Sequence, residues 1–254
     1  MSKYASLKEE AWAANVEIPL RGLALYTWGN VSAYDPALAV FAIKPSGVPY
    51  PDLKAEDMVV VDLEGKVVEG KLNPSSDTPT HMVLYRDFNT GGKASVRGII
   101  HTHSTYAVAW AQACRSIPLF GTTHADHLQT PIPCTPYLTR EAVEKDYELE
   151  TGNLIVEMFG AGLAGTVDKV GDATPLKPEE VPMALVGGHG PFAWGANAAK
   201  ALYNGAVLEE AARMAILTLQ IDPTASPLPD YIINKHYRRK HGPNAYYGQG
   251  GASR

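Results

Sequence analysis

Residues 96–106, VRGIIHTHSTY, place two histidines one residue apart at the end of an apolar run. The apolar run predicts a buried β-strand, and the stretch YAVAWAQAC that follows predicts a helix. Successive side chains of a strand point to opposite faces of a sheet, so His101 and His103 are expected on the same face. Two imidazoles on one face form a chelating pair, which indicates a metal site with further ligands from elsewhere in the chain.

The composition is that of a globular chain. Its 254 residues are 45% hydrophobic and 19% charged, which is enough for a substantial core in one domain. The formal net charge of −5 favours neither nucleic acid nor an anionic membrane surface as a partner. No run approaches the roughly 20 apolar residues of a membrane span, so we expect a soluble, cytoplasmic protein. Cys114 and Cys134 are expected to be reduced thiols.

The elements around the histidine pair alternate between helix and strand. Ser6 and Glu9 have the spacing of a capping box at the start of a first helix. A hairpin is expected to turn at Glu64 and Gly65. The expected helices cover residues 7–20, 77–88, 106–114, 139–159 and 197–220, and the expected β-rich segments cover 23–33, 40–47, 58–70, 96–104 and 183–195. This order predicts a mixed α/β or α+β domain with a surface insertion near 160–181.

A third histidine and a carboxylate are candidates to complete the metal site. His189 follows an apolar run and is flanked by glycines, which let backbone and ligand approach closely. Asp77 lies in NPSSDTPTH at the expected start of a helix. Three imidazoles and one oxygen suit zinc or another divalent first-row metal. The alternative is that His101 and His103 are polar surface residues, and the sequence alone does not bring His189 near them.

The same stretch, NPSSDTPTH, indicates an anion site. Ser75 and Ser76 precede a helix that has Pro79 in its first turn, so free backbone N–H groups and the positive end of the helix dipole are available to a phosphate. The alternative is an ordinary capped helix. The turn IKPSGVPY supplies further neutral donors, and Lys44 is close enough in sequence to contribute.

Further motifs run in order along nearly the whole chain: TWGNVSA, IKPSGV, KLNPSSDTPTH, IIHTHS, GTTHADH, IPCTP, ETGNLIVE, GGHGPFAWG and KHYRRKHGPNAYYGQ. Together they resemble the class II sugar-phosphate aldolase and epimerase family. Asp77 and the last of these motifs are similar to the epimerase branch, whereas the aldolases typically carry glutamate in place of that aspartate. The chain departs from the family pattern near NTGGKAS, near residues 160–181 and in the tail GGASR.

The resemblance implies an α/β fold of one domain, in which helices flank a central, mainly antiparallel β-sheet. It implies one divalent metal ion per subunit, with Zn²⁺ expected, and a homotetramer with active sites at its interfaces. The implied metal ligands are Asp77, His101, His103 and His189; the implied substrate contacts are Gly29, Asn30, Ser46, Gly47, Ser75 and Ser76; and the implied acid/base pair is Asp126 and Tyr247. The nearest competitor of Tyr247 for the acid/base role is Tyr246, and His124, His127 and His236 match less decisive positions.

The implied reaction interconverts L-ribulose 5-phosphate and D-xylulose 5-phosphate. Carbon 4 of this phosphorylated pentulose is not adjacent to the carbonyl, so its hydrogen is not acidic, and inversion requires retro-aldol cleavage, rotation of the aldehyde and re-addition. Asp126 and Tyr247 have reference pKa values of about 3.9 and 10, and each is expected to need a shift toward neutrality. Two alternatives remain open, a class II sugar-phosphate aldolase and a metal-free interaction module of the same fold.

Overall fold

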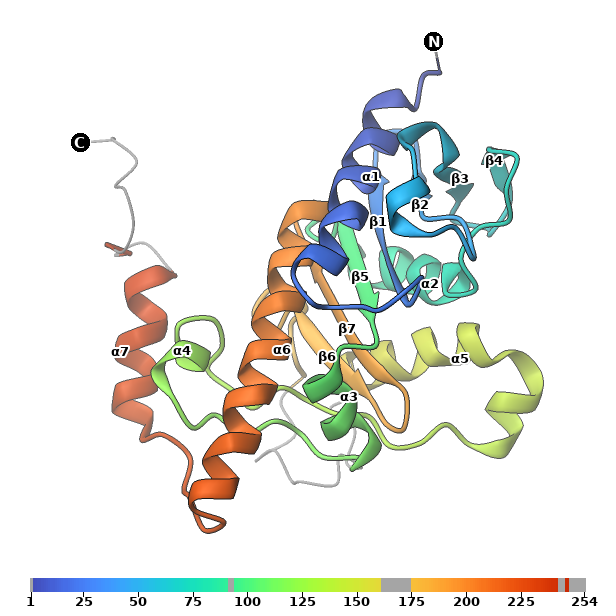
Figure 1. Cartoon of the computed structure of the whole chain (residues 1–254). Helices are drawn as coiled ribbons and strands as arrows, with labels where there is room; N and C mark the ends of the chain where they lie inside the picture. Colours follow the sequence, from blue (N-terminus) through green and yellow to red (C-terminus); the bar gives the residue numbers. More distant parts are fainter. Residues whose placement is uncertain (1, 91–93, 161–174, 242–244, 247–254) are drawn as a thin grey trace.

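The computed structural model describes residues 2–90, 94–160, 175–241 and 245–246. Its centre is a seven-stranded sheet in the order β4-β3-β2-β1-β5-β7-β6, and every neighbouring pair is antiparallel (Figure 1). The predicted α/β domain with a central antiparallel sheet is therefore confirmed. The strands are β1 (Gly29–Asp35), β2 (Val40–Ile43), β3 (Val59–Asp62), β4 (Val67–Glu69), β5 (Gly98–Thr102), β6 (Met183–Val186) and β7 (Gly190–Gly195).

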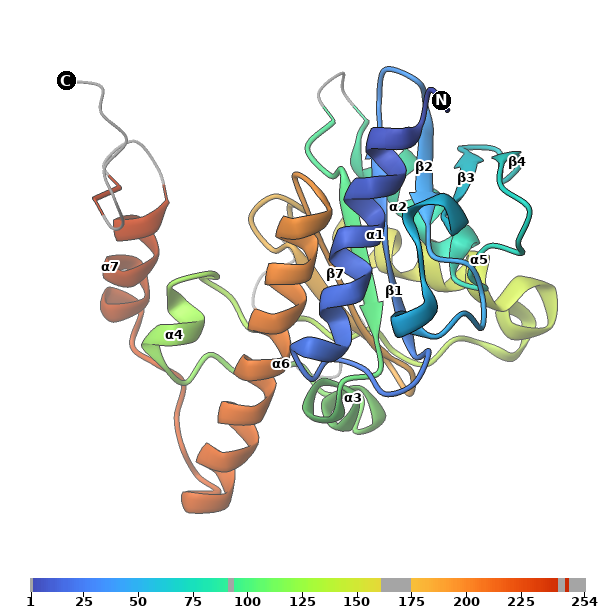
Figure 2. The same ribbon diagram turned by 45° about the horizontal axis from the view of Figure 1, so that its top comes forward.

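Helices cover both faces of the sheet. One face is covered by α1 and α6, while α2 and α5 pack together on the other (Figures 1 and 2). Phe88, Phe159 and Trp194 join α2, α5 and β7 through ring centroids 4.9 to 5.4 Å apart. The helices are α1 (Ala5–Leu20), α2 (Thr78–Phe88), α3 (Thr105–Gln112), α4 (Thr122–Ala125), α5 (Arg140–Gly160), α6 (Ala198–Ile221) and α7 (Asp230–Lys240), with short 3₁₀ turns η1 (Tyr50–Asp52) and η2 (Ala55–Asp57).

Strand β5 lies inside the sheet between β1 and β7 and carries the VRGIIHTHSTY sequence. All five of its residues are buried, because helices cover the sheet on both sides. Its antiparallel register pairs Asn30 of β1 with His101, and His101 with Phe192 of β7. The start of β1, the end of β5 and the turn before β7 therefore meet at one edge of the sheet.

Glycine is required where β1 begins. Gly29 has a φ of +111°, and a Cβ atom added to it would lie 2.8 Å from the backbone oxygen of His101. Only glycine has both this backbone freedom and the room for such a close approach. Gly29 thus allows β1 to enter the sheet directly beside His101.

The predicted capping box at the first helix is wrong. The helix begins at Ala5 and its N-cap is Tyr4, which makes no side-chain cap hydrogen bond. The backbone N–H of Tyr4 instead donates to Ser2 Oγ at 3.0 Å, and that hydroxyl donates to Glu69 at 2.7 Å. Contact with β4 therefore starts the helix before Ser6, so Ser6 and Glu9 lie inside it.

Several predicted boundaries also differ from the structure. The segment expected as a strand over 23–33 forms a strand only from Gly29, and β5 ends at Thr102, so His103 lies just beyond it. The predicted hairpin is confirmed, with β3 and β4 paired and Gly65 at a φ of +85°. Residues 161–174 of the predicted insertion lie outside the described residues, as does the tail GGASR.

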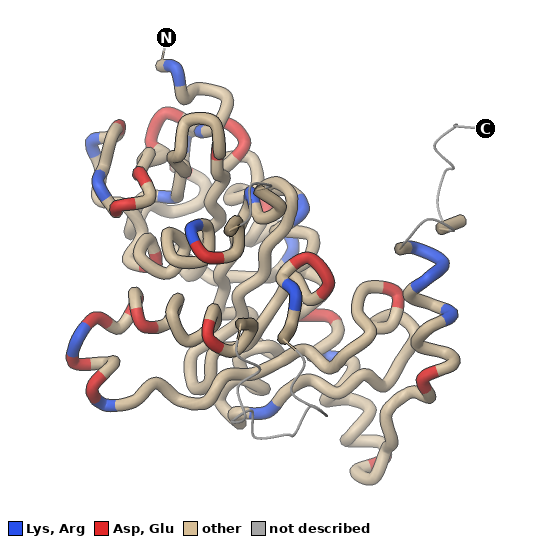
Figure 3. The backbone as a smooth tube through the Cα atoms, turned by 180° about the vertical axis from the view of Figure 1, so that it is seen from behind, with Lys and Arg blue, Asp and Glu red and all other residues tan. Residues whose placement is uncertain are grey.

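Helices α4 and α7 form a lobe that projects from the sheet beyond α6 (Figures 1 and 2). Ile233 of α7 packs against Leu119 and Ala125, and the backbone N–H of Leu228 donates to the carbonyl of Leu119 at 2.8 Å. The last turn of α7 carries two arginines and a lysine, which form a basic end to the lobe (Figure 3). In the described ranges, no helix combines the length and apolarity needed to cross a bilayer.

The lobe contains a buried histidine that should make stability depend on pH. Burial lowers the pKa of His124 to about 4, although its Nε2 atom lies 3.1 Å from the carbonyl of Thr130. The unfolded chain takes up a proton near pH 6.5, before the folded chain does, so the free energy of unfolding should fall as the pH drops from 6.5 to 4. The expected loss is roughly 2 to 4 kcal/mol from this residue.

Urea denaturation at pH 7 and pH 4.5 measures this loss, and His124→Gln provides the comparison. The variant should lose clearly less stability over that interval than the parent chain. Equal losses in the two proteins would show that His124 does not titrate as its burial implies.

Candidate active site

Three histidines from two segments converge at the edge of the sheet where β1 and β5 meet. His101 lies near the end of β5, His103 follows that strand, and His189 lies in the turn between β6 and β7. One nitrogen from each ring can be chosen so that all three lie within 4.8 Å of one another. The structure thus brings together the three histidines predicted from the sequence, which we call the histidine triad.

The spacing of the triad fits a small cation. The Nε2 atoms of His101 and His103 are 3.1 Å apart. Two nitrogen ligands in a tetrahedral zinc site, each about 2.0 to 2.1 Å from the metal, are separated by roughly 3.3 Å. The Nδ1 atom of His101 lies 3.0 Å from the carbonyl of Pro191, so as a donor there it leaves Nε2 free to bind a metal.

The environment favours the neutral form of two members of the triad, His103 and His189. Burial lowers the pKa of His189 to about 3, and the nearby imidazoles of His101 and His103 act in the same direction. Burial and His101 also lower the pKa of His103. The Nδ1 atom of His189 is buried without a hydrogen-bond partner among the described residues. Neutral imidazoles are the form that binds metals, so the donor set fits a divalent cation.

Close packing fixes the turn that carries His189. The backbone N–H of Gly187 donates to Thr135 Oγ1 at 3.0 Å, and that of Gly188 donates to the carbonyl of Ala111 at 2.7 Å. Gly188 has a φ of +73°, and an added Cβ atom would lie 2.6 Å from the ring of Tyr137. Helix α3 therefore connects the two parts of the triad, because it starts just after His103 and holds the His189 turn at its other end.

Replacing Gly188 with alanine should weaken metal binding. The new methyl group has to displace Tyr137 or the turn, and the turn carries His189 directly. We expect at least a tenfold loss of metal affinity, since misplacing one ligand resembles loss of an outer-shell partner, which costs about 10- to 100-fold. Competition with a chromogenic chelator measures the affinity.

Gly22→Ala is the matched control. Gly22 has a similar φ of +68°, but an added Cβ atom would have no neighbour within 4 Å. Both variants carry the backbone strain of a left-handed alanine, about 1 to 2 kcal/mol, whereas only Gly188→Ala also meets Tyr137. Equal metal affinities in the two variants would contradict the positioning role of the turn.

The triad opens into a pocket of about 620 Å³ that also contains the predicted anion site. Ser75, Ser76, Ser46, Gly47 and Asn30 all line it. The Oδ1 atom of Asn30 is buried without a partner among the described residues. The structure thus places these residues in the same pocket as the histidines.

Lys44 adds a buried positive charge to the pocket. The residue is 2% exposed, and burial lowers its pKa to about 8. The Nζ atom donates to the carbonyl of Pro45 at 3.2 Å and lies 5.1 Å from the ring centroid of Tyr50. Removing a charge from water is unfavourable unless it is compensated, so an anion in the pocket would stabilise this lysine.

Asp77 lines the pocket but does not join the nitrogen cluster. It is the N-cap of α2, and its Oδ2 atom accepts a hydrogen bond of 2.6 Å from Asn30. Burial acts to raise its pKa, but His101, His81 and the Asn30 amide outweigh burial and hold the pKa below its usual value. An ionised carboxylate is thereby held beside the triad.

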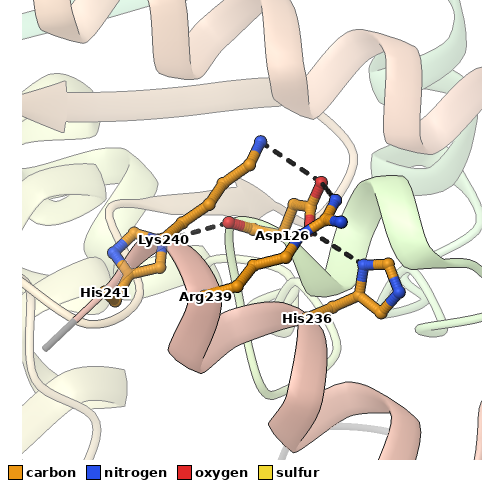
Figure 4. A network of polar contacts seen from close by, with 5 residues as sticks. All are labelled: Asp126, His236, Arg239, Lys240 and His241. Atoms are coloured by element: carbon orange, nitrogen blue, oxygen red, sulfur yellow. Dashed lines mark hydrogen bonds and ion pairs between the residues drawn. The ribbon is translucent and has the colours of Figure 1, made fainter. Parts of the chain in front are cut away.

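Asp126 lies in the lobe, outside the pocket of its own chain. Arg239 binds both carboxylate oxygens at 2.9 and 2.7 Å, His236 lies at 3.0 Å and Lys240 at 3.2 Å (Figure 4). Burial acts to raise the pKa of Asp126, but these partners lower it to about 2. The expected shift toward neutrality is therefore wrong for Asp126 in this chain.

The predicted tyrosine falls partly outside the structure. Tyr247 lies outside the described residues. Tyr246, its competitor, is exposed just after α7, and its backbone N–H donates to the carbonyl of Arg239 at 3.0 Å. The described part of the C-terminal segment thus follows the lobe that holds Asp126 and does not line the pocket of its own chain.

The structure also places residues in the pocket that the sequence did not indicate. Tyr147 and Glu148 line it, and the ring of Tyr147 lies beside that of His189. The sequence 139–159 has the pattern of a continuous helix, but the backbone leaves the helical conformation at Asp146, with φ −167° and ψ 97°. A helical pattern alone does not reveal that such a break turns a side chain into a pocket.

A profile of the family described as Class II Aldolase and Adducin N-terminal domain matches residues 9–216. The chain belongs to the class II aldolase family. Among curated members, L-ribulose-5-phosphate 4-epimerase UlaF of Salmonella paratyphi B is 49% identical over 243 residues, covering 96% of this chain and 98% of that protein. The enzyme of the same name from Salmonella typhi has the same identity and coverage.

Solved structures share the class II aldolase fold. An L-fuculose 1-phosphate aldolase superposes with a TM-score of 0.69 at 23% identity, covering 94% of this chain and 97% of that one. The L-fuculose-1-phosphate aldolase of Thermus thermophilus gives a TM-score of 0.60 at 25% identity, with 89% and 100% coverage. These likenesses support the architecture described above.

Proposed function

We propose that this chain is a metal-dependent L-ribulose-5-phosphate 4-epimerase, an isomerase that interconverts L-ribulose 5-phosphate and D-xylulose 5-phosphate. The 49% identity to relatives of that name, over almost their whole length, supports this assignment. The observation that carries it is a single pocket in which three clustered histidines adjoin an anion site with a buried lysine. A phosphorylated ketose presents oxygens to a metal ion at the histidines and a phosphate to the anion site.

The triad is the proposed centre for one divalent cation per subunit, with Zn²⁺ as the expected ion. Three imidazole donors suit zinc, and a catalytic zinc site keeps a position open for substrate. Asp77 is the proposed oxygen ligand, and its ionised state fits that role. When bound, the cation supplies Lewis-acid stabilisation of the negative charge that develops on substrate oxygens.

The anion site holds the phosphate throughout the reaction. Cleavage between carbons 3 and 4 releases glycolaldehyde phosphate, which must turn its carbonyl over before it is attacked on the opposite face. Lys44, Asn30 and the hydroxyls of Ser46 and Ser75 bind the phosphate while the aldehyde rotates. The proposed substrate contacts are Gly29, Asn30, Ser46, Gly47, Ser75 and Ser76, with Lys44 added.

Asp126 and Tyr247 are the proposed acid/base pair at carbon 4. Because Asp126 lies in the projecting lobe, it has to reach the pocket of a neighbouring copy to act. This arrangement requires an oligomer, and we propose a cytoplasmic homotetramer with active sites at the interfaces. Arg239, His236 and Lys240 keep Asp126 in the ionised form that a proton acceptor for the carbon 4 hydroxyl needs, although its pKa of about 2 makes it a weak base within the single chain.

Product analysis tests the proposed reaction. Incubation with L-ribulose 5-phosphate should form D-xylulose 5-phosphate without accumulation of glycolaldehyde phosphate. Stoichiometric release of the aldehyde would identify an aldolase instead. Efficient turnover of unphosphorylated L-ribulose would contradict the role of the anion site.

A further inference from the structure

Tyr147 reaches the pocket because helix α5 is broken just before it. The backbone of Asp146 is extended, and its Oδ1 atom accepts a hydrogen bond of 3.1 Å from the backbone N–H of Leu149. This is the pattern of an N-cap, so a second helical segment starts at the break. Tyr147 and Glu148 lie in its first turn and line the pocket.

The segment is anchored to the helix that carries Asp77. Thr80 Oγ1 of α2 donates to the carbonyl of Glu148 at 2.6 Å, and Thr151 Oγ1 donates to the carbonyl of Tyr147 at 2.8 Å. Gly152 allows α5 to approach α2 closely, because an added Cβ atom would lie 2.8 Å from Val83. Tyr147 therefore has a fixed position relative to the pocket.

The phenol lies at the His189 side of the pocket. Its ring centroid is 5.7 Å from that of His189, and the residue is 36% exposed. Its hydroxyl makes no hydrogen bond within the residues that the structure describes. Burial raises the pKa of Tyr147, and the charges of Glu148 and Asp77 act in the same direction, so the hydroxyl remains a donor at neutral pH.

Strand order shows which end of the substrate this hydroxyl meets. Asn30 of the anion site lies on β1, His101 on β5, and His189 just before β7, and β5 lies between the other two strands. A 2-ketopentose whose phosphate on carbon 5 lies beside Asn30 and whose middle oxygens face the triad extends carbon 1 toward His189.

We propose that the Tyr147 hydroxyl hydrogen-bonds the carbon 1 hydroxyl of the pentulose and selects ketoses that carry it. This inference rests on the proposed function, because it assumes a 2-ketopentose 5-phosphate in the pocket. Val108, the apolar residue that lines the pocket near the triad, offers no such bond. Tyr147 is a specificity-determining residue for the end of the substrate opposite the phosphate.

A substrate lacking that hydroxyl tests the proposal. The kcat/KM of the unaltered protein and of Tyr147→Phe is measured with L-ribulose 5-phosphate and with 1-deoxy-L-ribulose 5-phosphate. The unaltered protein should prefer the natural substrate by about 10- to 100-fold from this contact, since a donor without its partner is left in the pocket. Tyr147→Phe should lose most of that preference, whereas Tyr34→Phe, a core tyrosine stacked on Tyr85 outside the pocket, should retain it.

The ratio between substrates separates recognition from a general structural effect. A Tyr147→Phe protein that slows equally on both substrates, or keeps the full preference, overturns the proposal. Calorimetric binding of the two sugar phosphates gives the same comparison if turnover of the variant is too slow to measure. Absence of epimerisation by the unaltered, metal-loaded protein would instead reject the proposed function.

Discussion

Replacing His103 with alanine is expected to abolish metal binding and nearly all activity. The triad supplies the three proposed nitrogen ligands, and loss of His103 leaves two imidazoles and the Asp77 carboxylate, which we expect to hold the ion too weakly at micromolar concentration. Because Lewis-acid stabilisation is worth several kcal/mol, the fall in kcat should be at least about 10³-fold. Metal content is measured by plasma emission after gel filtration, and activity by D-xylulose 5-phosphate formation.

His127→Gln is the control for removing a histidine. His127 lies in the lobe and does not line the pocket of its own chain. This variant should bind the same amount of metal as the unaltered protein. A His103→Ala protein that still holds one metal ion per chain would contradict the assignment of the triad.

Replacing Asp126 with asparagine should reduce kcat by about 10² to 10⁴ while metal affinity stays unchanged. The factor is that of a general acid or base, and the residue makes no contact with the triad of its own chain. The amide can still accept a hydrogen bond from Arg239, so the lobe should keep its structure. Asp126→Asn should therefore fold and assemble normally.

A mixed oligomer tests whether Asp126 acts in a neighbouring subunit. Chains with His103→Ala and chains with Asp126→Asn are co-expressed with different tags, and oligomers that contain both are purified. An interface between an intact triad of one chain and an intact Asp126 of the other should restore a substantial part of the activity that each parent variant lacks. If mixed oligomers form and remain inactive, the acid/base group and the triad belong to the same chain.

Much of the fold could be predicted from sequence patterns. The strand over 96–104, the helix over 77–88 and the hairpin at Gly65 follow from local apolar periodicity and turn chemistry. Predictions from local sequence patterns were wrong where contacts between distant residues determine the structure. Ser2 binds β4 and starts the first helix early, and the break at Asp146 lies inside an apparently continuous helix. Helix α7 was not predicted, because its mostly polar sequence gains its order from packing against Leu119 and Ala125.

The candidate site, too, could be predicted from the sequence only in part. His101 and His103 were paired from their spacing, and His189 was a candidate from its flanking glycines. The structure brings His189 beside the pair because α3 and the Thr135 hydroxyl hold its turn. These are contacts between residues far apart in sequence, which no local pattern contains. The low pKa of Asp126 was missed for the same reason, since its basic partners lie more than 100 residues away.

Metal removal tests whether the reaction requires an ion bound at the histidine triad. The protein is treated with a chelator, freed of it by dialysis, and assayed for conversion of L-ribulose 5-phosphate to D-xylulose 5-phosphate. We predict that the metal-free protein is inactive and that about one equivalent of Zn²⁺ per chain restores activity, whereas metal-free His103→Ala protein is not restored. Full activity of the metal-free protein would contradict the proposed metal-dependent reaction.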